Sequence, residues 1–67
     1  MRVLLCEIRT GLFYRSPGQW TAQRDQAVNF GTSPKAIVYA RENGLNDVEI
    51  FWDFDDEEYN VRLPIAA

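Results

Sequence analysis

Residues 33–54, SPKAIVYARENGLNDVEIFWDF, contain the two clearest elements of the chain and decide its fold. Ser33 followed by Pro34 is typical of a helix start, because Ser caps a helix and Pro is tolerated in the first turn. Gly44 supplies the left-handed residue that often ends a helix. The pattern therefore predicts a helix over about residues 34–43.

The segment after this helix has the period of a strand. Residues 48–54 alternate so that one face is fully apolar, as expected for a strand that buries one side. That apolar set consists of Val48, Ile50, Trp52 and Phe54. The predicted helix has small side chains at Ala36 and Ala40, which allow it to lie close to a sheet. A helix packed on a sheet is the expected arrangement.

The first third of the chain predicts a hairpin. Residues 2–9 form the first strand, and the unbroken apolar run VLLC within it favours a strand covered on both faces, hence central in its sheet. Gly11 lies in a short turn, and residues 12–15 return as the second strand before a Ser-Pro-Gly stop. Residues 19–32 have poor periodicity and predict a polar connection, in which Thr21 caps at most one helical turn.

These elements predict an α+β fold of the ββαβ(β) type. A right-handed helical crossover leaves a one-strand gap, and the first strand fills that gap antiparallel to both of its neighbours. The expected sheet has three or four strands in the order 2-1-3 or 2-1-3-4, with the helix on one face. Residues 59–67 form a terminal strand or a tail, which Pro64 confines to an edge. The 67 residues can bury one core, so residues 1–67 form a single domain.

Four short patterns resemble small uncharacterised bacterial and phage domains. The patterns are TGLFY at residues 10–14, Trp20-Thr21, AVNF at residues 27–30, and Ser33 with Ala36 after it. Domains of that group have a hairpin, a W-T element, an A-x-x-F element and a helix opened by Ser or Thr. The resemblance covers about residues 8–40 and implies a fold. It implies no activity and no site residue.

The composition argues against an enzyme. The chain has no His and one Cys, so it lacks the commonest general base and metal ligand. Cys6 lies among apolar residues, which predicts a buried thiol with a raised pKa and not a nucleophile. The acidic run at residues 53–58 lacks the spaced ligands and the Gly of a calcium loop. We expect no catalytic residue, no cofactor and no metal site.

A single Cys cannot form an internal disulfide, which favours a reducing compartment. No stretch approaches the roughly 18 uncharged apolar residues of a membrane span. We therefore expect a cytoplasmic protein that does not bind a membrane. The net charge of −3 is unevenly divided, because residues 36–67 contain eight of the ten carboxylates. The acidic loop at residues 55–58 is either a solvated loop or a surface for a basic partner.

The distribution of apolar side chains between the two sheet faces suggests an interaction surface. If the helix covers Leu4, Cys6 and Ile8 of the first strand, other apolar residues remain on the opposite face. Either the connection with Trp20 and Phe30 covers that face, or a second protein does. We predict a non-enzymatic interaction module that acts as a homodimer or with a protein partner. The candidate interface residues are Val3, Leu5 and Phe51 on that face, or Tyr59, Val61 and Leu63 on the edge formed by residues 59–65.

Two alternatives remain open. The first is a nucleic-acid-associated accessory protein that uses arginines and aromatic side chains around the hairpin for phosphate contact and base stacking. Its candidate residues are Arg9, Tyr14, Arg15, Trp20 and Arg24. The net charge of −3 and the single Lys argue against this alternative. The second is an acidic inhibitor that mimics nucleic acid through the carboxylates of residues 55–58.

Overall fold

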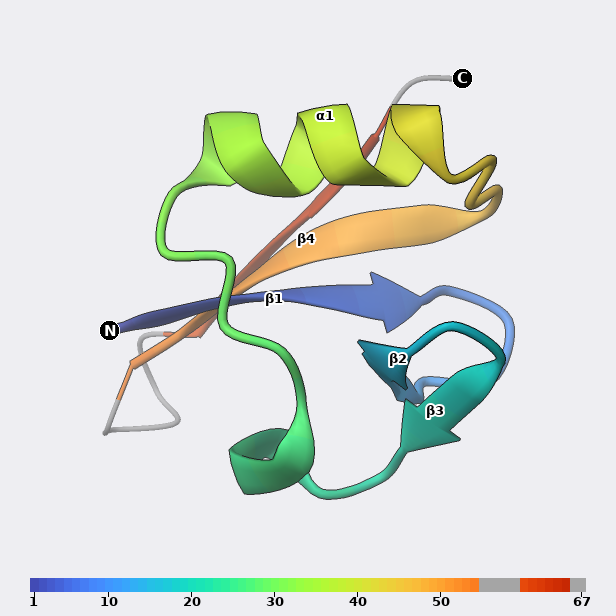
Figure 1. Cartoon of the computed structure of the whole chain (residues 1–67). Coiled ribbons are helices and arrows are strands. Elements are labelled where there is room, and N and C mark those ends of the chain that lie inside the picture. The colour runs from blue at the N-terminus through green and yellow to red at the C-terminus, as the bar shows by residue number, and fades with distance from the viewer. Residues whose placement is uncertain (55–59, 66–67) are drawn as a thin grey trace.

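The computed structural model describes residues 1–54 and 60–65, which fold as an antiparallel sheet with one α-helix packed on one face (Figure 1). The strands are β1 (Arg2–Glu7), β2 (Phe13–Ser16), β3 (Gln19–Thr21), β4 (Val48–Asp53) and β5 (Val61–Pro64). The helices are the short 3₁₀-helix η1 (Arg24–Gln26) and the α-helix α1 (Ser33–Glu42). The predicted α+β class is confirmed.

The strands lie in the order β3-β2-β1-β4-β5, and every neighbouring pair is antiparallel. β1 therefore lies between the second strand and the strand after the helix, as its unbroken apolar run predicts. The terminal segment adds β5 beyond β4, which agrees with the second of the two predicted orders, 2-1-3-4. One strand, β3, extends this order at the opposite edge.

β3 was not predicted from the sequence, because residues 19–32 were interpreted as a polar connection. Pro17 and Gly18 form the two-residue turn between Ser16 and Gln19, which are paired across β2 and β3. Gly18 has a φ of 76°, and Pro followed by a left-handed Gly is the signature of a type II turn. This Pro-Gly pair, placed between Tyr14 and Trp20, is the signal that predicts a second hairpin.

The α1 helix begins one residue earlier than expected. Thr32 is the N-cap, and its hydroxyl accepts a hydrogen bond from the backbone N–H of Lys35. The C-terminal end closes with Gly44 at a φ of 62° and with the N–H of Leu45 donating to the carbonyl of Ala40. This is the left-handed stop that the sequence predicts.

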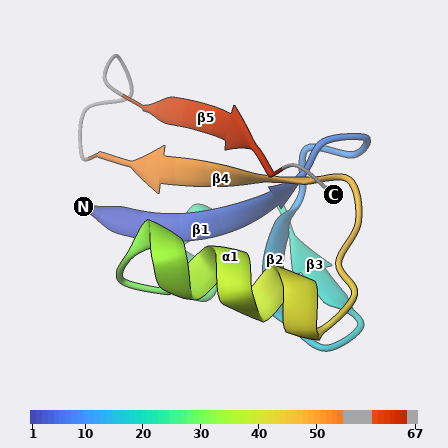
Figure 2. The same cartoon turned by 90° about the horizontal axis from the view of Figure 1, so that it is seen from above.

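The helix lies on the sheet through its small residues, because Ala36 and Ala40 are fully buried. Figure 2 shows α1 over β1 and beside β2, with β5 at the edge farther from the helix. The core under the helix contains Val3, Leu5, Tyr14, Ala36, Ala40, Val48 and Ile50. Trp52 packs against this core at its margin. The predicted helix-facing side of β4 is therefore confirmed for Val48, Ile50 and Trp52, whereas Phe54 follows the end of the strand.

The prediction for the faces of β1 was wrong by one residue. Val3 and Leu5 face the helix, whereas Leu4 and Cys6 belong to a second core on the other face with Phe13 and Phe51. The cause is the register with β4, in which Val3 pairs with Trp52 and Leu5 with Ile50. Cross-strand partners share a face, but an unbroken apolar run does not reveal which face that is.

The connection between η1 and α1 passes from one face of the sheet to the other. Ala27 packs on the second core, whereas Val28 and Phe30 pack on the core under the helix. The N–H of Val28 donates to Tyr14 of β2, and the N–H of Phe30 donates to Val3 of β1. Trp20 and Phe30 thus support the helix side, and they do not cover the second face.

Candidate functional site

The second face of the sheet is closed by the chain itself. Phe51 is 3% exposed and packs edge-on against Phe13, with the ring centroids 5.1 Å apart. The guanidiniums of Arg62 and Arg24 lie over the Phe51 ring at 5.0 and 6.0 Å from its centroid. The expectation of an uncovered apolar surface at Val3, Leu5 and Phe51 is therefore wrong: Val3 and Leu5 lie under the helix, and Phe51 lies under two arginines.

A hollow of about 590 Å³ lies over the two phenylalanines and is bordered by Arg24, Asn60 and Arg62. Both arginines already contact carboxylates, since Arg24 lies 3.3 Å from Asp53 and Arg62 lies 3.6 Å from Glu49. These ion pairs make the arginines part of the cover over the second core. Because both guanidiniums are paired with carboxylates of this chain, the hollow does not have the character of an anion-binding site.

Asp53 joins three parts of the structure. This buried carboxylate binds the guanidinium of Arg2 from the neighbouring strand and that of Arg24 from η1. A buried carboxylate needs such partners, because an unpaired buried charge is costly. The arrangement holds η1 against the sheet and explains the position of Arg24 over Phe51.

Cys6 has the environment of a structural thiol. It is buried on the second face opposite Glu49 of β4. Burial raises the pKa of the Cys6 thiol, and the nearby negative charge of Glu49 raises it further. A raised pKa keeps the thiol protonated and poorly nucleophilic at neutral pH. The prediction of a buried Cys6 with a raised pKa is confirmed.

The residues proposed for nucleic-acid contact do not form one open surface. Tyr14 is buried, its hydroxyl lies 2.7 Å from that of Tyr39, and its ring packs edge-on against Trp20. Arg24 is engaged with Asp53, and the Arg15 guanidinium donates to Gln26. Arg9 is exposed, but Tyr14 is not available as a platform for a stacked base.

The open edge of β5 has the most exposed apolar side chains of the described sheet. Val61 is 50% exposed and Leu63 is 55% exposed. They pair with Trp52 and Ile50 respectively, so both lie on the face that carries the helix. Their exposure agrees with Figure 2, in which β5 lies beyond the part of the sheet that α1 covers. Tyr59, the remaining candidate interface residue, lies outside the described residues.

The backbone of β5 has a defined orientation. The N–H of Ile65 donates to the carbonyl of Val48 at 3.2 Å. Because paired and unpaired residues alternate along an antiparallel ladder, the peptide groups of Leu63 and Val61 also face β4. Those of Arg62 and Pro64 face outward from the sheet. Pro64 thus occupies a position where its missing N–H costs the β4–β5 ladder nothing.

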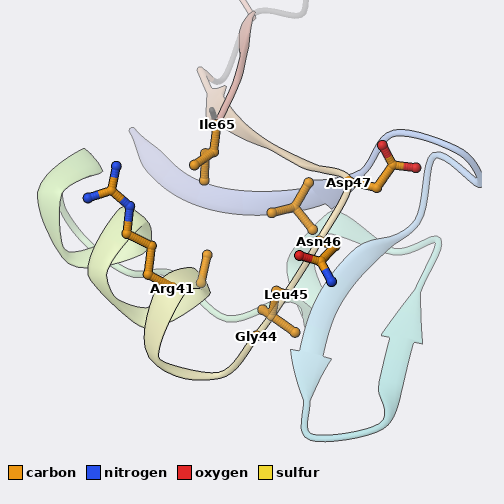
Figure 3. A pocket seen from close by; sticks show the side chains of 8 residues that line it. Arg41, Gly44, Leu45, Asn46, Asp47 and Ile65 are labelled. Carbon is orange, nitrogen blue, oxygen red and sulfur yellow. The ribbon is translucent and has the colours of Figure 1, made fainter. Parts of the chain in front are cut away.

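A small pocket lies where β5 ends near the C-terminal end of α1 (Figure 3). Its volume is about 220 Å³, and it lies between Ile65 and the segment that follows the helix. The lining residues are Ala40, Arg41, Gly44, Leu45, Asn46, Asp47, Val48 and Ile65. Ile65 also packs on the core under the helix. The apolar strip of β5, formed by Val61 and Leu63, is therefore continuous with that core.

The sequence thus predicted the edge formed by residues 59–65, with Val61 and Leu63 as candidate interface residues, and it did not predict that Trp52 of β4 borders this edge. Trp52 was predicted to be covered by the helix; it packs against the core under the helix and is partly buried. The expectation of an acidic surface falls at residues 55–58, outside the described residues. Over residues 1–54 and 60–65, no cluster of three or more Cys, Asp or Glu side chains is placed to hold a metal ion.

Comparisons with protein-family models, with curated proteins and with solved structures find no significant match to this chain. Within the part of the chain that the structure describes, no helix combines the length and the apolar character required to cross a membrane.

Proposed function

We propose that this protein is a small non-enzymatic interaction module that binds a protein strand at the open edge of β5, and that this strand is β5 of a second copy. The observation that carries the proposal is the exposure of Val61 and Leu63 on an edge strand. An uncovered apolar edge is a template for adding another strand, and proteins usually protect such edges.

The two sheet edges differ in a way that favours β5. β3 has three residues, and its side chains at Gln19 and Thr21 are polar. β5 has four residues, all exposed, and two of them are large and apolar. Strand addition at β5 removes apolar surface from water, whereas addition at β3 removes little.

A second copy can bind at this edge because the strip formed by Val61 and Leu63 is complementary to the same strip of another chain. Val61 and Leu63 are two residues apart on one face, so an antiparallel copy brings the Val61 of each chain near the Leu63 of the other. An interface with a two-fold axis uses the same surface on both subunits. Trp52 and Ile65 border the strip, and they would extend the apolar contact.

Sedimentation of the wild-type protein at tens of micromolar tests this proposal against two matched variants. Leu63→Lys places a charge on the β5 strip, whereas Val38→Lys places one on a helix position that is equally open, at 52% exposed. We expect a wild-type dimer, a dissociation constant raised at least about tenfold by Leu63→Lys, and no change from Val38→Lys. A wild-type monomer, or equal effects of the two variants, would contradict the proposal.

A further inference from the structure

We infer that the second copy adds in one register, with the two-fold axis at Arg62, so that Val61 of each chain faces Leu63 of the other. This inference rests on the proposed function, because it specifies how two β5 edges meet. It follows from the outward peptide groups of β5, from the side chains on its two faces, and from the contact between Arg62 and Glu49.

The outward peptide groups discriminate between registers. Arg62 offers an N–H and a carbonyl, whereas Pro64 offers only a carbonyl. With the axis at Arg62, the two arginines face each other and their peptide groups pair in both directions. With the axis at Leu63, Arg62 faces Pro64 of the second copy, and the Arg62 carbonyl meets no donor. Within β5 itself, the first register pairs both peptide groups of Arg62, which favours that register.

The helix-side face agrees with this choice. With the axis at Arg62, Val61 lies directly opposite Leu63 of the second copy, and the same pair occurs twice. These positions do not exchange hydrogen bonds in the new ladder, and side chains approach most closely at such positions. Both apolar side chains of the strip would therefore be covered.

The opposite face brings the two Arg62 side chains together, and like charges directly opposite each other destabilise a strand pair. In this protein, however, each guanidinium is held over Phe51 on the neighbouring strand, 5.0 Å from the ring centroid. It lies 3.6 Å from Glu49, which is also on β4. Both contacts draw the charge inward from the edge, and Glu49 supplies the opposite charge. We assign Glu49 the role of a positioning residue that makes the Arg62 register acceptable.

Engineered cysteines test the register, because a disulfide needs Cα atoms within about 7 Å of each other. Under mild oxidation, an equal mixture of Val61→Cys and Leu63→Cys proteins should form the mixed disulfide, and neither variant alone should form a dimer disulfide. The native Cys6 is buried and common to all samples. A disulfide in Leu63→Cys alone would place the axis at Leu63 and overturn the register, while leaving the proposed function intact.

Two other outcomes overturn different claims. If no variant forms a disulfide and the wild-type protein is nevertheless a dimer by sedimentation, the copies do not pair through β5, and both the register and the β5 site are wrong. If the wild-type protein is a monomer, self-association itself is wrong. The failure of the register is thus distinguishable from the failure of the proposed function.

The role of Glu49 has its own test. Glu49→Gln keeps the size of the side chain and removes its charge, so we expect the dimer dissociation constant to rise about two- to fivefold. The same change made together with Arg62→Ala should have no effect beyond that of Arg62→Ala, because the repelling charges are then absent. Equal effects of Glu49→Gln in both backgrounds would overturn the positioning role. Far-UV circular dichroism confirms that each variant is folded.

Discussion

The hydroxyl groups of Tyr14 and Tyr39 lie 2.7 Å apart and join β2 to the helix. Their rings pack edge-on, and both rings contact Phe30 from the connection that crosses the sheet. Trp20 of β3 adds an edge-on contact to Tyr14. This aromatic cluster fixes the second hairpin against α1 and explains why its side chains are unavailable for an external partner.

The first prediction concerns stability at high pH. Burial and the hydrogen bond with Tyr39 raise the pKa of Tyr14 to about 12 from its ordinary value of 10.0. Unfolding releases this constraint, so the stabilisation is complete below about pH 10 and is lost as the pH rises toward 12. Denaturant unfolding over this range should show a steeper decline for the wild type than for Tyr14→Phe. Parallel declines would contradict the prediction.

The second prediction concerns the Asp53 ion pairs. Asp53→Asn removes the charge that holds Arg2 and Arg24, and we expect a loss of about 1–3 kcal/mol in the free energy of unfolding. The exposed Asp25 in η1 provides the control, because Asp25→Asn should change stability by less than about 0.5 kcal/mol. Urea unfolding measures both variants. A loss for Asp53→Asn no larger than that for Asp25→Asn would show that the pairs contribute nothing.

The third prediction concerns the core under the helix. Ile50 is 2% exposed, and truncating a buried Ile to Ala costs about 2–5 kcal/mol. For a chain of 67 residues this is a large part of the total stability, so Ile50→Ala should be largely unfolded at 37 °C. Val38→Ala on the exposed face of α1 serves as the control. A measured loss below about 0.5 kcal/mol for Ile50→Ala would contradict the placement of Ile50 in the core.

The fourth prediction concerns the second face. Phe51→Glu buries a carboxylate between Phe13 and the two arginines, and we expect it to disrupt folding and not merely association. Phe51→Leu keeps an apolar side chain and should remain folded. Far-UV circular dichroism and thermal unfolding distinguish the two. A folded Phe51→Glu protein with an unchanged spectrum would mean that this face is open to solvent.

The sequence predicts the helix and the strand after it because each has a local signal, whereas the antiparallel order rests on the right-handed crossover and the terminal segment fits either a strand or a tail. Pro34 and Gly44 mark the helix ends, and the alternation of residues 48–54 marks one face of β4. The central position of β1 followed from its unbroken apolar run. The same run does not show which side chains of β1 face the helix, because apolar residues at every position are compatible with either orientation of the strand.

The candidate site was only partly predictable for a related reason. The apolar residues Val61 and Leu63 are visible in the sequence, but their exposure depends on how far α1 extends across the sheet. The cover over Phe51 depends on Arg24 and Arg62, which come from distant parts of the chain and meet only in the folded structure. Sequence periodicity contains no information about such long-range contacts.

The most direct test of strand addition at β5 is hydrogen exchange of the Arg62 amide, measured by NMR from about 20 µM to about 1 mM protein. This amide faces outward, whereas the Leu63 amide faces β4 and serves as the control within the same strand. We predict that protection of the Arg62 amide rises with protein concentration while that of Leu63 does not rise in proportion. Rapid exchange of Arg62 at every concentration would contradict the account.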